Sequence, residues 1–293
     1  MAPNASIAIV TGANKGIGLS VVKHLALQYP SSAFSRNGTL PFLIYLTARD
    51  PGRGEAAAQA LQNDVDLKKA KALAVDGGLS TIQFRGLDIS NADSIKDLGA
   101  FLQNEHPDGI DIVVNNAGIA MNGFDANVVK ETLHTNYHGT LLASQTLLPL
   151  LRPNGRIVNV ASIAGYLGNK YAPSLKQQFY AAKTVPDVTK LMDAFNTSVA
   201  NGTYQKDGWP ASAYMVAKAG EIGFTRVLAK EEAEKGNGVL VNACCPGWVS
   251  TDMTKGRGHK NVDQGAQTPV LLALGELRGK TGQFWQDEIV IEW

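Results

Sequence analysis

Two residues able to transfer a proton, Tyr214 and Lys218, lie four positions apart in the segment SAYMVAKAG. On a helix, residues at this spacing share one face, so both side chains can act on one ligand. A phenol has an ordinary pKa of about 10 and is a slow acid at neutral pH, but a nearby ammonium favours its ionised form. The spacing predicts a proton-transfer site in which Lys218 tunes Tyr214, although such pairs also occur by chance in many helices.

A third candidate, Ser162, closes the segment RIVNVAS, whose β-branched composition is typical of a buried strand. Open α/β sheets bind their ligands at the carboxyl ends of their strands. A hydroxyl there can donate to a substrate oxygen and stabilise the charge that develops when a hydride reaches the adjacent carbon. Tyr214 would then protonate that oxygen while Lys218 holds the ribose of a nicotinamide cofactor. The alternative is that Ser162 is only a cap at the strand end.

A glycine-rich loop, TGANKGIG, follows directly after the first β-branched run. Glycines let the backbone turn tightly and approach a pyrophosphate, whose charge is favoured at a helix amino terminus. The loop therefore predicts a dinucleotide-binding site, although it also fits an ordinary glycine-rich turn. The predicted cofactor residues in it are Gly12, Asn14, Lys15, Gly16, Ile17 and Gly18.

The end of the second predicted strand indicates which dinucleotide is bound. An NAD site normally has an acidic side chain there, but this strand ends in Thr-Ala-Arg49. Arg49, together with Lys15 and Arg53, favours the 2′-phosphate of NADP(H). The adjacent Asp50 is followed by Pro51, so we expect it to cap a helix rather than bind ribose. The alternative is that Lys15 and Arg49 are solvated surface charges.

Short apolar runs alternate with longer amphipathic segments along the chain, and this order predicts a parallel, doubly wound sheet. We expect one Rossmann-like α/β domain over residues 1–293, with about seven strands and a helical insert at 163–211 before the catalytic helix. No role is evident for the loops 29–41 and 70–80. The expected strands are 6–11, 42–48, 81–88, 111–115, 156–162 and 238–245. The expected helices are 16–28, 52–63, 91–105, 125–150 and 212–235, with 174–183 and 186–200 inside the insert.

Composition limits the possible partners. The 27 Lys and Arg nearly balance the 26 Asp and Glu, so a nucleic-acid partner is not expected. No spaced metal-ligand pattern is present, and no apolar run reaches membrane-spanning length. The only cysteines, Cys244 and Cys245, are neighbours, which indicates a reducing compartment and a cytoplasmic protein. These thiols are either reactive, if exposed, or small apolar residues in a strand.

Six motifs occur in the order typical of one family: TGANKGIG, NNAG at 115–118, HTNYHGT at 134–140, NVAS at 159–162, YMVAK at 214–218 and CCPGWVSTDM at 244–253. Over nearly its whole length the chain resembles the short-chain dehydrogenase/reductase family. It is most similar to the monomeric NADPH-dependent carbonyl reductases, which share TARD, KDGWPASAY, NACCPGWV and a GQF ending. In the common form of the family the serine and tyrosine are much closer in sequence than 162 and 214.

The resemblance implies further site residues and an oligomeric state. Asn136 would complete a catalytic tetrad with Ser162, Tyr214 and Lys218, by bending its helix and holding a water that links Lys218 to solvent. The insert would cover helices that otherwise build a tetramer, which implies a monomer. Further cofactor contacts would come from Asp88 and Ile89 at the adenine, Asn115, Ala117 and Gly118 at the ribose, and Pro246, Val249 and Thr251 at the nicotinamide.

An apolar substrate pocket is expected beside the nicotinamide. Trp248, Ile163, Tyr166 and Met215 would suit an aromatic ketone, a quinone or an aldehyde, although Ile163 and Met215 fit a core equally well. The expected function is NADPH-dependent reduction of a carbonyl to an alcohol. The alternatives are a dedicated ketone reductase of specialised metabolism and a non-catalytic NADP-binding sensor or scaffold. An intact tetrad argues against the scaffold.

Overall fold

The computed structural model describes residues 5–293, so the first four residues of the predicted domain lie outside it. In the described residues, one eight-stranded sheet has the order β3-β2-β1-β4-β5-β6-β7-β8. The pairs from β3 to β7 are parallel, and β8 pairs antiparallel with β7. This confirms the predicted doubly wound fold and adds a short strand at one edge. The strands are β1 Ser6–Val10, β2 Phe42–Ala48, β3 Ser80–Gly86, β4 Ile110–Asn115, β5 Leu151–Val160, β6 Leu240–Cys245, β7 Phe284–Gln286 and β8 Ile289–Ile291.

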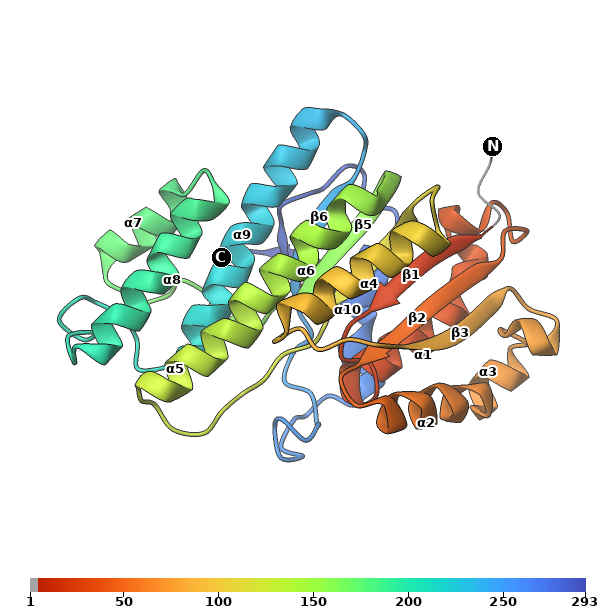
Figure 1. Cartoon of the computed structure of the whole chain (residues 1–293), viewed down its shortest axis with the longest axis horizontal. Helices are drawn as coiled ribbons and strands as arrows, with labels where there is room; N and C mark the ends of the chain where they lie inside the picture. The colour runs from red at the N-terminus through yellow and green to blue at the C-terminus, as the bar shows by residue number, and fades with distance from the viewer. Residues whose placement is uncertain (1–4) are drawn as a thin grey trace.

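Helices cover both faces of the sheet (Figure 1). One apolar core lies beneath α4, α5, α6 and α9, and the other beneath α1, α2 and α10. Because both faces are covered, β1, β4 and β6 are buried along their whole length, which explains their apolar composition. The helices are α1 Gly16–Gln28, α2 Pro51–Gln62, α3 Val65–Lys69, α4 Ala92–Glu105, α5 Ala126–Thr132, α6 Thr140–Leu147, α7 Pro173–Ala181, α8 Val185–Ala200, α9 Ala213–Lys235 and α10 Val262–Leu274.

Two of the expected elements differ from the structure by more than two residues. The long helix predicted at 125–150 is interrupted by a π-helical turn, Leu133–Gly139, between α5 and α6. The apolar spacing continues through that turn, so the sequence pattern does not reveal it. Strand β5 begins at Leu151, earlier than expected, because Leu151 pairs with Ile110 before a register shift.

The insert forms a helical lobe against α9 (Figure 1). Helix α8 approaches α9 closely over two glycines, where a Cβ on Gly220 would lie 2.5 Å from Met192 Sδ and one on Gly223 would lie 3.2 Å from Val188. Trp209 packs against the rings of Phe179 and Phe195. The insert therefore braces the helix that carries Tyr214 and Lys218.

The two loops without a predicted role lie at the amino-terminal ends of the strands. Pro41 accepts a hydrogen bond from the first residue of β1, and Leu79 accepts one from the first residue of β2. Ligands of this fold bind at the opposite edge, so both loops are remote from the candidate site.

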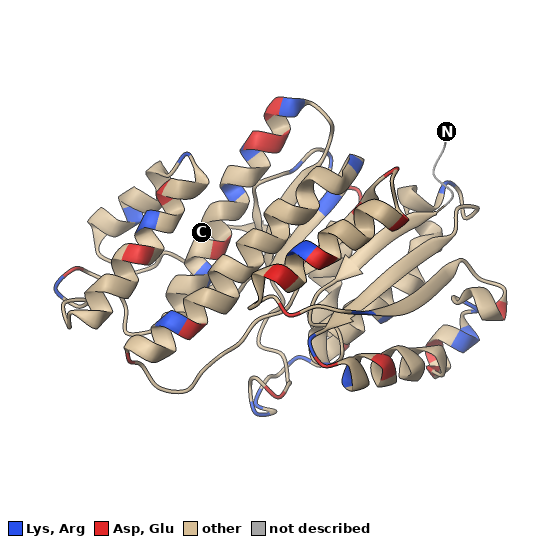
Figure 2. Ribbon diagram, viewed as in Figure 1, with Lys and Arg blue, Asp and Glu red and all other residues tan. Residues whose placement is uncertain are grey.

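Charged residues are carried mainly by the helices and loops, where Lys and Arg mix with Asp and Glu (Figure 2). None of the helices within residues 5–293 is long and apolar enough to span a membrane. The same residues contain no cluster of three His, Cys, Asp or Glu side chains able to hold a metal ion.

Candidate active site

The glycine loop and the segment after β4 meet where the strand order reverses between β1 and β4. The Thr11 hydroxyl accepts hydrogen bonds of 3.0 Å from the backbone N–H groups of both Asn116 and Ala117. Gly12 has φ +61°, and a Cβ there would lie 2.8 Å from Ala117 Cα. A Cβ on Gly18 would lie 2.4 Å from Asn116 Nδ2. The close approach of two backbone segments requires glycine at these positions. An ordinary glycine-rich turn would not require it.

The amino terminus of α1 has no side-chain cap, because Lys15 at the N-cap position makes no capping hydrogen bond. By contrast, Asp50 caps α2 and Asn91 caps α4. The first N–H groups of a helix require partners, and a pyrophosphate supplies them together with favourable charge. This terminus, reached through the glycine loop, fits the phosphates of a dinucleotide.

Arg49 lines a pocket of about 490 Å³ at the carboxyl ends of β2 and β3, together with Asp88. Asp50 caps α2 as predicted, since its carboxylate accepts a 2.8 Å hydrogen bond from the Arg53 backbone. The Arg53 side chain is exposed, 3.9 Å from Asp50, and does not line the pocket. Arg85, which the sequence analysis missed, does line it and stacks on the Phe101 ring at 3.8 Å. Its place near the end of β3, beside the end of β2 that carries Arg49, was the available signal.

The Lys15 side chain pairs with a carboxylate and does not line the pocket that contains Arg49. Its ammonium lies 2.6 Å from Asp252, in the loop after β6, and this contact lowers the pKa of Asp252. Thr251 lies in the same loop, and its methyl group is 3.6 Å from where a Gly16 Cβ would be. The segment expected at the nicotinamide, which includes Pro246 and the buried Val249, thus follows β6 and reaches the glycine loop.

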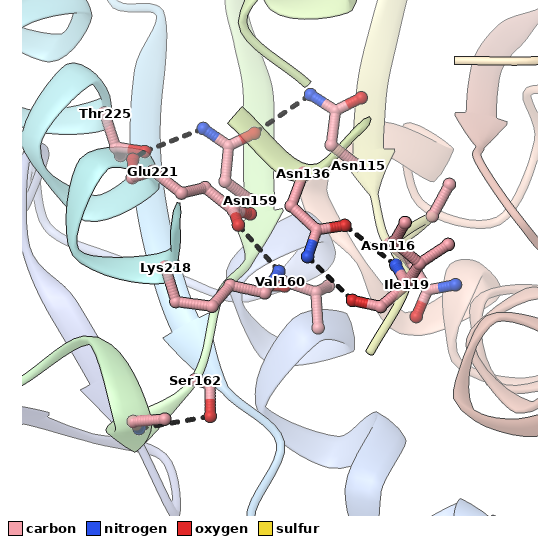
Figure 3. A network of polar contacts seen from close by, with 12 residues as sticks. Asn115, Asn116, Ile119, Asn136, Asn159, Val160, Ser162, Lys218, Glu221 and Thr225 are labelled. Carbon is pink, nitrogen blue, oxygen red and sulfur yellow. Dashed lines mark hydrogen bonds and ion pairs between the residues drawn. The ribbon is translucent and has the colours of Figure 1, made fainter. Parts of the chain in front are cut away.

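Asn136 lies in the π-helical turn and is fully buried. Its side-chain amide donates to the Ile119 carbonyl at 2.7 Å and accepts from the Ile119 N–H at 2.8 Å (Figure 3). Gly118 lies beside it, because a Cβ there would be 3.2 Å from Asn136 Oδ1 and 3.9 Å from Lys218 Nζ. Asn136 therefore fixes the loop after β4 next to Lys218.

The Lys218 ammonium is buried and held at two points. It donates to the Val160 carbonyl at 2.9 Å and to Glu221 Oε2 at 2.6 Å (Figure 3). Burial works to lower the pKa of Lys218, but Glu221 and Tyr214 raise it, and the net shift is upward. Because Val160 precedes Ser162 by two residues, the end of β5 brings the serine to the same place.

Tyr214 lies next to both partners that the sequence predicted for it. The Lys218 ammonium is 5.9 Å from the centre of its ring. Burial raises the pKa of the Tyr214 phenol, Lys218 lowers it, Glu221 raises it and the nearby Ser162 hydroxyl lowers it; the net shift is upward. Tyr214 is therefore a phenol at neutral pH and can act as a proton donor.

Asn115 and Ile89 lie at the expected strand ends but are turned inward. The Asn115 amide donates to Asn159 at 2.9 Å and to Ser144 at 3.0 Å within the core (Figure 3). Ile89 is buried under the π-helical turn, where its carbonyl would lie 2.2 Å from a Cβ on Gly139. The contacts expected from Asn115 with the ribose and from Ile89 with the adenine can therefore be made only by backbone atoms.

Three of the four predicted substrate residues are exposed rather than in the core: Ile163 at 48%, Tyr166 at 42% and Trp248 at 54%. Met215 is half-buried and packs against the core. Met121 and Met253 were missed; both are exposed and follow the carboxyl ends of β4 and β6. Exposed apolar side chains at this edge can contact an apolar substrate.

Both cysteines are buried in β6 and free of disulfide bonds. Burial raises the pKa of the Cys245 thiol and raises that of Cys244 well above its usual value. Of the two interpretations, the structure supports small apolar residues rather than reactive thiols.

Fold and site together define a nicotinamide-dependent oxidoreductase of short-chain type. The family model described as short chain dehydrogenase matches residues 6–183 and 193–262, and the chain belongs to this family. Carbonyl reductase (NADPH) 1 of Homo sapiens is 39% identical over 303 residues that cover 100% of both chains.

Two solved structures extend the comparison. Salutaridine reductase from Papaver somniferum has a TM-score of 0.79 at 26% identity and covers 96% of this chain and 99% of its own. Menthone neomenthol reductase from Mentha piperita has a TM-score of 0.75 at 26% identity, and the match covers 97% of this chain and 99% of the reductase. The expected family and enzyme class are confirmed, and the expected cofactor agrees with the name of the human relative.

Proposed function

We propose that this protein is an NADPH-dependent carbonyl reductase that converts ketones, aldehydes or quinones to alcohols. The observation that carries the proposal is the convergence of three groups at the carboxyl ends of the strands. The Tyr214 phenol and the Lys218 ammonium come from α9 and the Ser162 hydroxyl follows the end of β5, and both Lys218 and Ser162 lower the pKa of Tyr214. A binding scaffold has no need of a proton donor at this position.

The chain's own residues fit NADP(H). The uncapped amino terminus of α1 would hold the pyrophosphate, and Arg49 would hold the 2′-phosphate in the pocket beside β2. Val249, Thr251 and the loop after β4 would flank the ribose and nicotinamide. When bound, NADPH supplies the hydride that adds to the carbonyl carbon.

Tyr214 then transfers its proton to the carbonyl oxygen, which completes the alcohol and leaves a phenolate that regains a proton from solvent. Ser162 donates a hydrogen bond to the same oxygen as its negative charge grows. Lys218 stabilises the transient phenolate and, through its remaining N–H, holds the ribose. Its two protein hydrogen bonds fix that N–H in direction.

The test is to follow NADPH absorbance with a panel of aldehydes, ketones and quinones. We expect several aromatic or bulky carbonyl compounds to be reduced, with alcohol formed in equal amount to the NADPH consumed. Absence of turnover with every compound, despite tight NADPH binding, would support the scaffold alternative instead.

A dedicated ketone reductase is the second candidate. It is favoured by the fold likeness to two solved reductases whose names each specify a particular substrate. The same panel distinguishes it, because one ketone would then exceed all others by several orders of magnitude in kcat/KM.

Replacing Arg49 with Ala is expected to weaken NADPH binding about 10–100-fold, since a charge-assisted contact contributes about 1.5–3 kcal/mol. NADH lacks the 2′-phosphate, so its binding should change little. Titration of both nucleotides by fluorescence measures the difference. Arg53→Ala is the matched control, because that side chain lies outside the pocket. Equal losses for NADPH and NADH would show that Arg49 does not bind the phosphate.

We also propose a monomeric, cytoplasmic protein. Helix α8 covers much of α9, over Gly220 and Gly223, so that face of α9 is not free to pair with a second copy. Light scattering on the purified protein should give the mass of one chain, and a stable dimer or tetramer would contradict the proposal.

A further inference from the structure

Glu221 is a buried carboxylate that the reaction as described above does not use. It lies one helical turn after Lys218 on α9, and its side chain is 1% exposed. Its Oε2 atom accepts a 2.6 Å hydrogen bond from the Lys218 ammonium. The Glu221 backbone carbonyl accepts from Thr225, which in turn accepts from Asn159 on β5 (Figure 3). Glu221 is therefore fixed in place beside the two proton-transfer residues.

Burying a carboxylate is costly unless a cation and hydrogen bonds compensate it. Burial raises the pKa of Glu221 to about 7, while Lys218 acts to lower it. At pH values above this pKa the Glu221 carboxylate is charged. A phenol, with an ordinary pKa of about 10, loses its proton within that pH range. A residue that only filled space on this face of α9 would need no charge, so the carboxylate calls for an explanation.

We propose that Glu221 is a positioning residue that neutralises the charge of Lys218 and thereby keeps Tyr214 protonated, favouring reduction over alcohol oxidation. This proposal rests on the proposed function of the site. An unpaired ammonium beside Tyr214 would favour the phenolate, which is a base and serves oxidation. The paired ammonium exerts a weaker net field, and it is held against Val160 in a fixed orientation.

The remaining titratable groups around the pair do not change this conclusion. On α9 the nearest is Tyr214 itself, and from β6 Cys244 and Cys245 face the pair. Burial raises the pKa of both thiols, so they are neutral at physiological pH. Glu221 is the only carboxylate among the groups that affect the pKa of Tyr214 or Lys218 in the described part of the chain.

The test replaces Glu221 with Gln, which keeps the shape and an acceptor oxygen but removes the charge. Tyr214 then loses a neighbouring negative charge, and Lys218 loses the partner that opposes its desolvation, so both should deprotonate at lower pH. The alkaline limb of the pH profile for NADPH-dependent reduction should move down by about one pH unit. The rise of alcohol oxidation with pH should also begin at lower pH.

Glu232→Gln is the matched control. Glu232 is also buried on α9 and is also paired with a lysine one helical turn away, Lys235, which in this case follows the glutamate. It lies roughly 16 Å along the helix from Glu221, taking 1.5 Å per residue. The same chemical change there should leave the pH profile where it is in the unchanged protein.

A second readout does not depend on turnover. The ionisation of Tyr214 is measured by tyrosinate ultraviolet absorbance, as the difference between each protein and its Tyr214→Phe version. We expect this ionisation at lower pH in the Glu221→Gln variant. If that variant does not fold, Glu221→Met removes the charge at similar length and should shift both readouts in the same direction.

The outcomes separate this proposal from the proposed function. Unchanged profiles and unchanged tyrosinate titration in folded Glu221 variants would overturn the role of Glu221 while leaving the reductase intact. An equal shift in Glu232→Gln would also overturn it. Absence of NADPH turnover in the unchanged protein would overturn the function alone, since the tyrosinate titration would still report on Glu221.

Discussion

Tyr214→Phe should reduce NADPH-dependent turnover by about 10²–10⁴-fold, the contribution of a positioned general acid. The variant loses one hydroxyl and keeps the ring, so packing and NADPH affinity should stay close to those of the unchanged protein. Because the phenol gives up its proton only as the transition state forms, kcat and kcat/KM should fall together. Steady-state kinetics, with fluorescence titration of NADPH, measures both effects.

Tyr204→Phe makes the same chemical change in the insert, where Tyr204 packs edge-on against Phe124 at 4.9 Å. This control should keep full turnover. Retained activity in Tyr214→Phe would remove the phenol from the mechanism and leave the proposed reductase without its proton donor.

Gly12→Ala should destabilise the protein by about 3 kcal/mol and abolish NADPH binding. The left-handed conformation, with φ +61°, costs an alanine about 1–2 kcal/mol, and the Cβ would lie 2.8 Å from Ala117 Cα. Relief of that clash moves the glycine loop away from the segment after β4, at a further cost of about 1–3 kcal/mol. Urea unfolding and NADPH titration measure the two effects.

Gly236→Ala separates backbone strain from the clash. Gly236 has φ +66° at the end of α9, and nothing lies within 4 Å of its Cβ position. This variant should lose only the backbone cost of about 1–2 kcal/mol and bind NADPH normally. Equal effects of the two substitutions would show that the contact with Ala117 does not matter.

The sequence was sufficient for most of the fold because the signals were local. Strands buried on both faces need continuous β-branched runs, and such runs gave the positions of β1, β2, β4 and β6 to within a few residues. The last two strands of the sheet, β7 and β8, have three residues each and are too short to produce a pattern. The π-helical turn at Asn136 was implied only by the family resemblance, since apolar spacing continues through it.

Within the site, the sequence missed contacts between distant segments. Lys15 was expected to face a phosphate, but it pairs with Asp252, 237 residues away. Asn115 was expected at the ribose, but its amide is taken up by Asn159 and Ser144. Neither partner can be deduced from spacing along the chain.

By itself the sequence determined the class of fold, the glycine loop and the residue types of the proton-transfer set, because each depends on neighbours in the chain. Only the tertiary structure decided which charged residues affect the ionisation of Tyr214. In the sequence, Lys218 and Glu221 are an ordinary pair one helical turn apart, of the kind that is usually solvated and weak. Packing of α9 against β5 and β6 removes water from that pair, and the lower dielectric makes its charges act strongly on Tyr214.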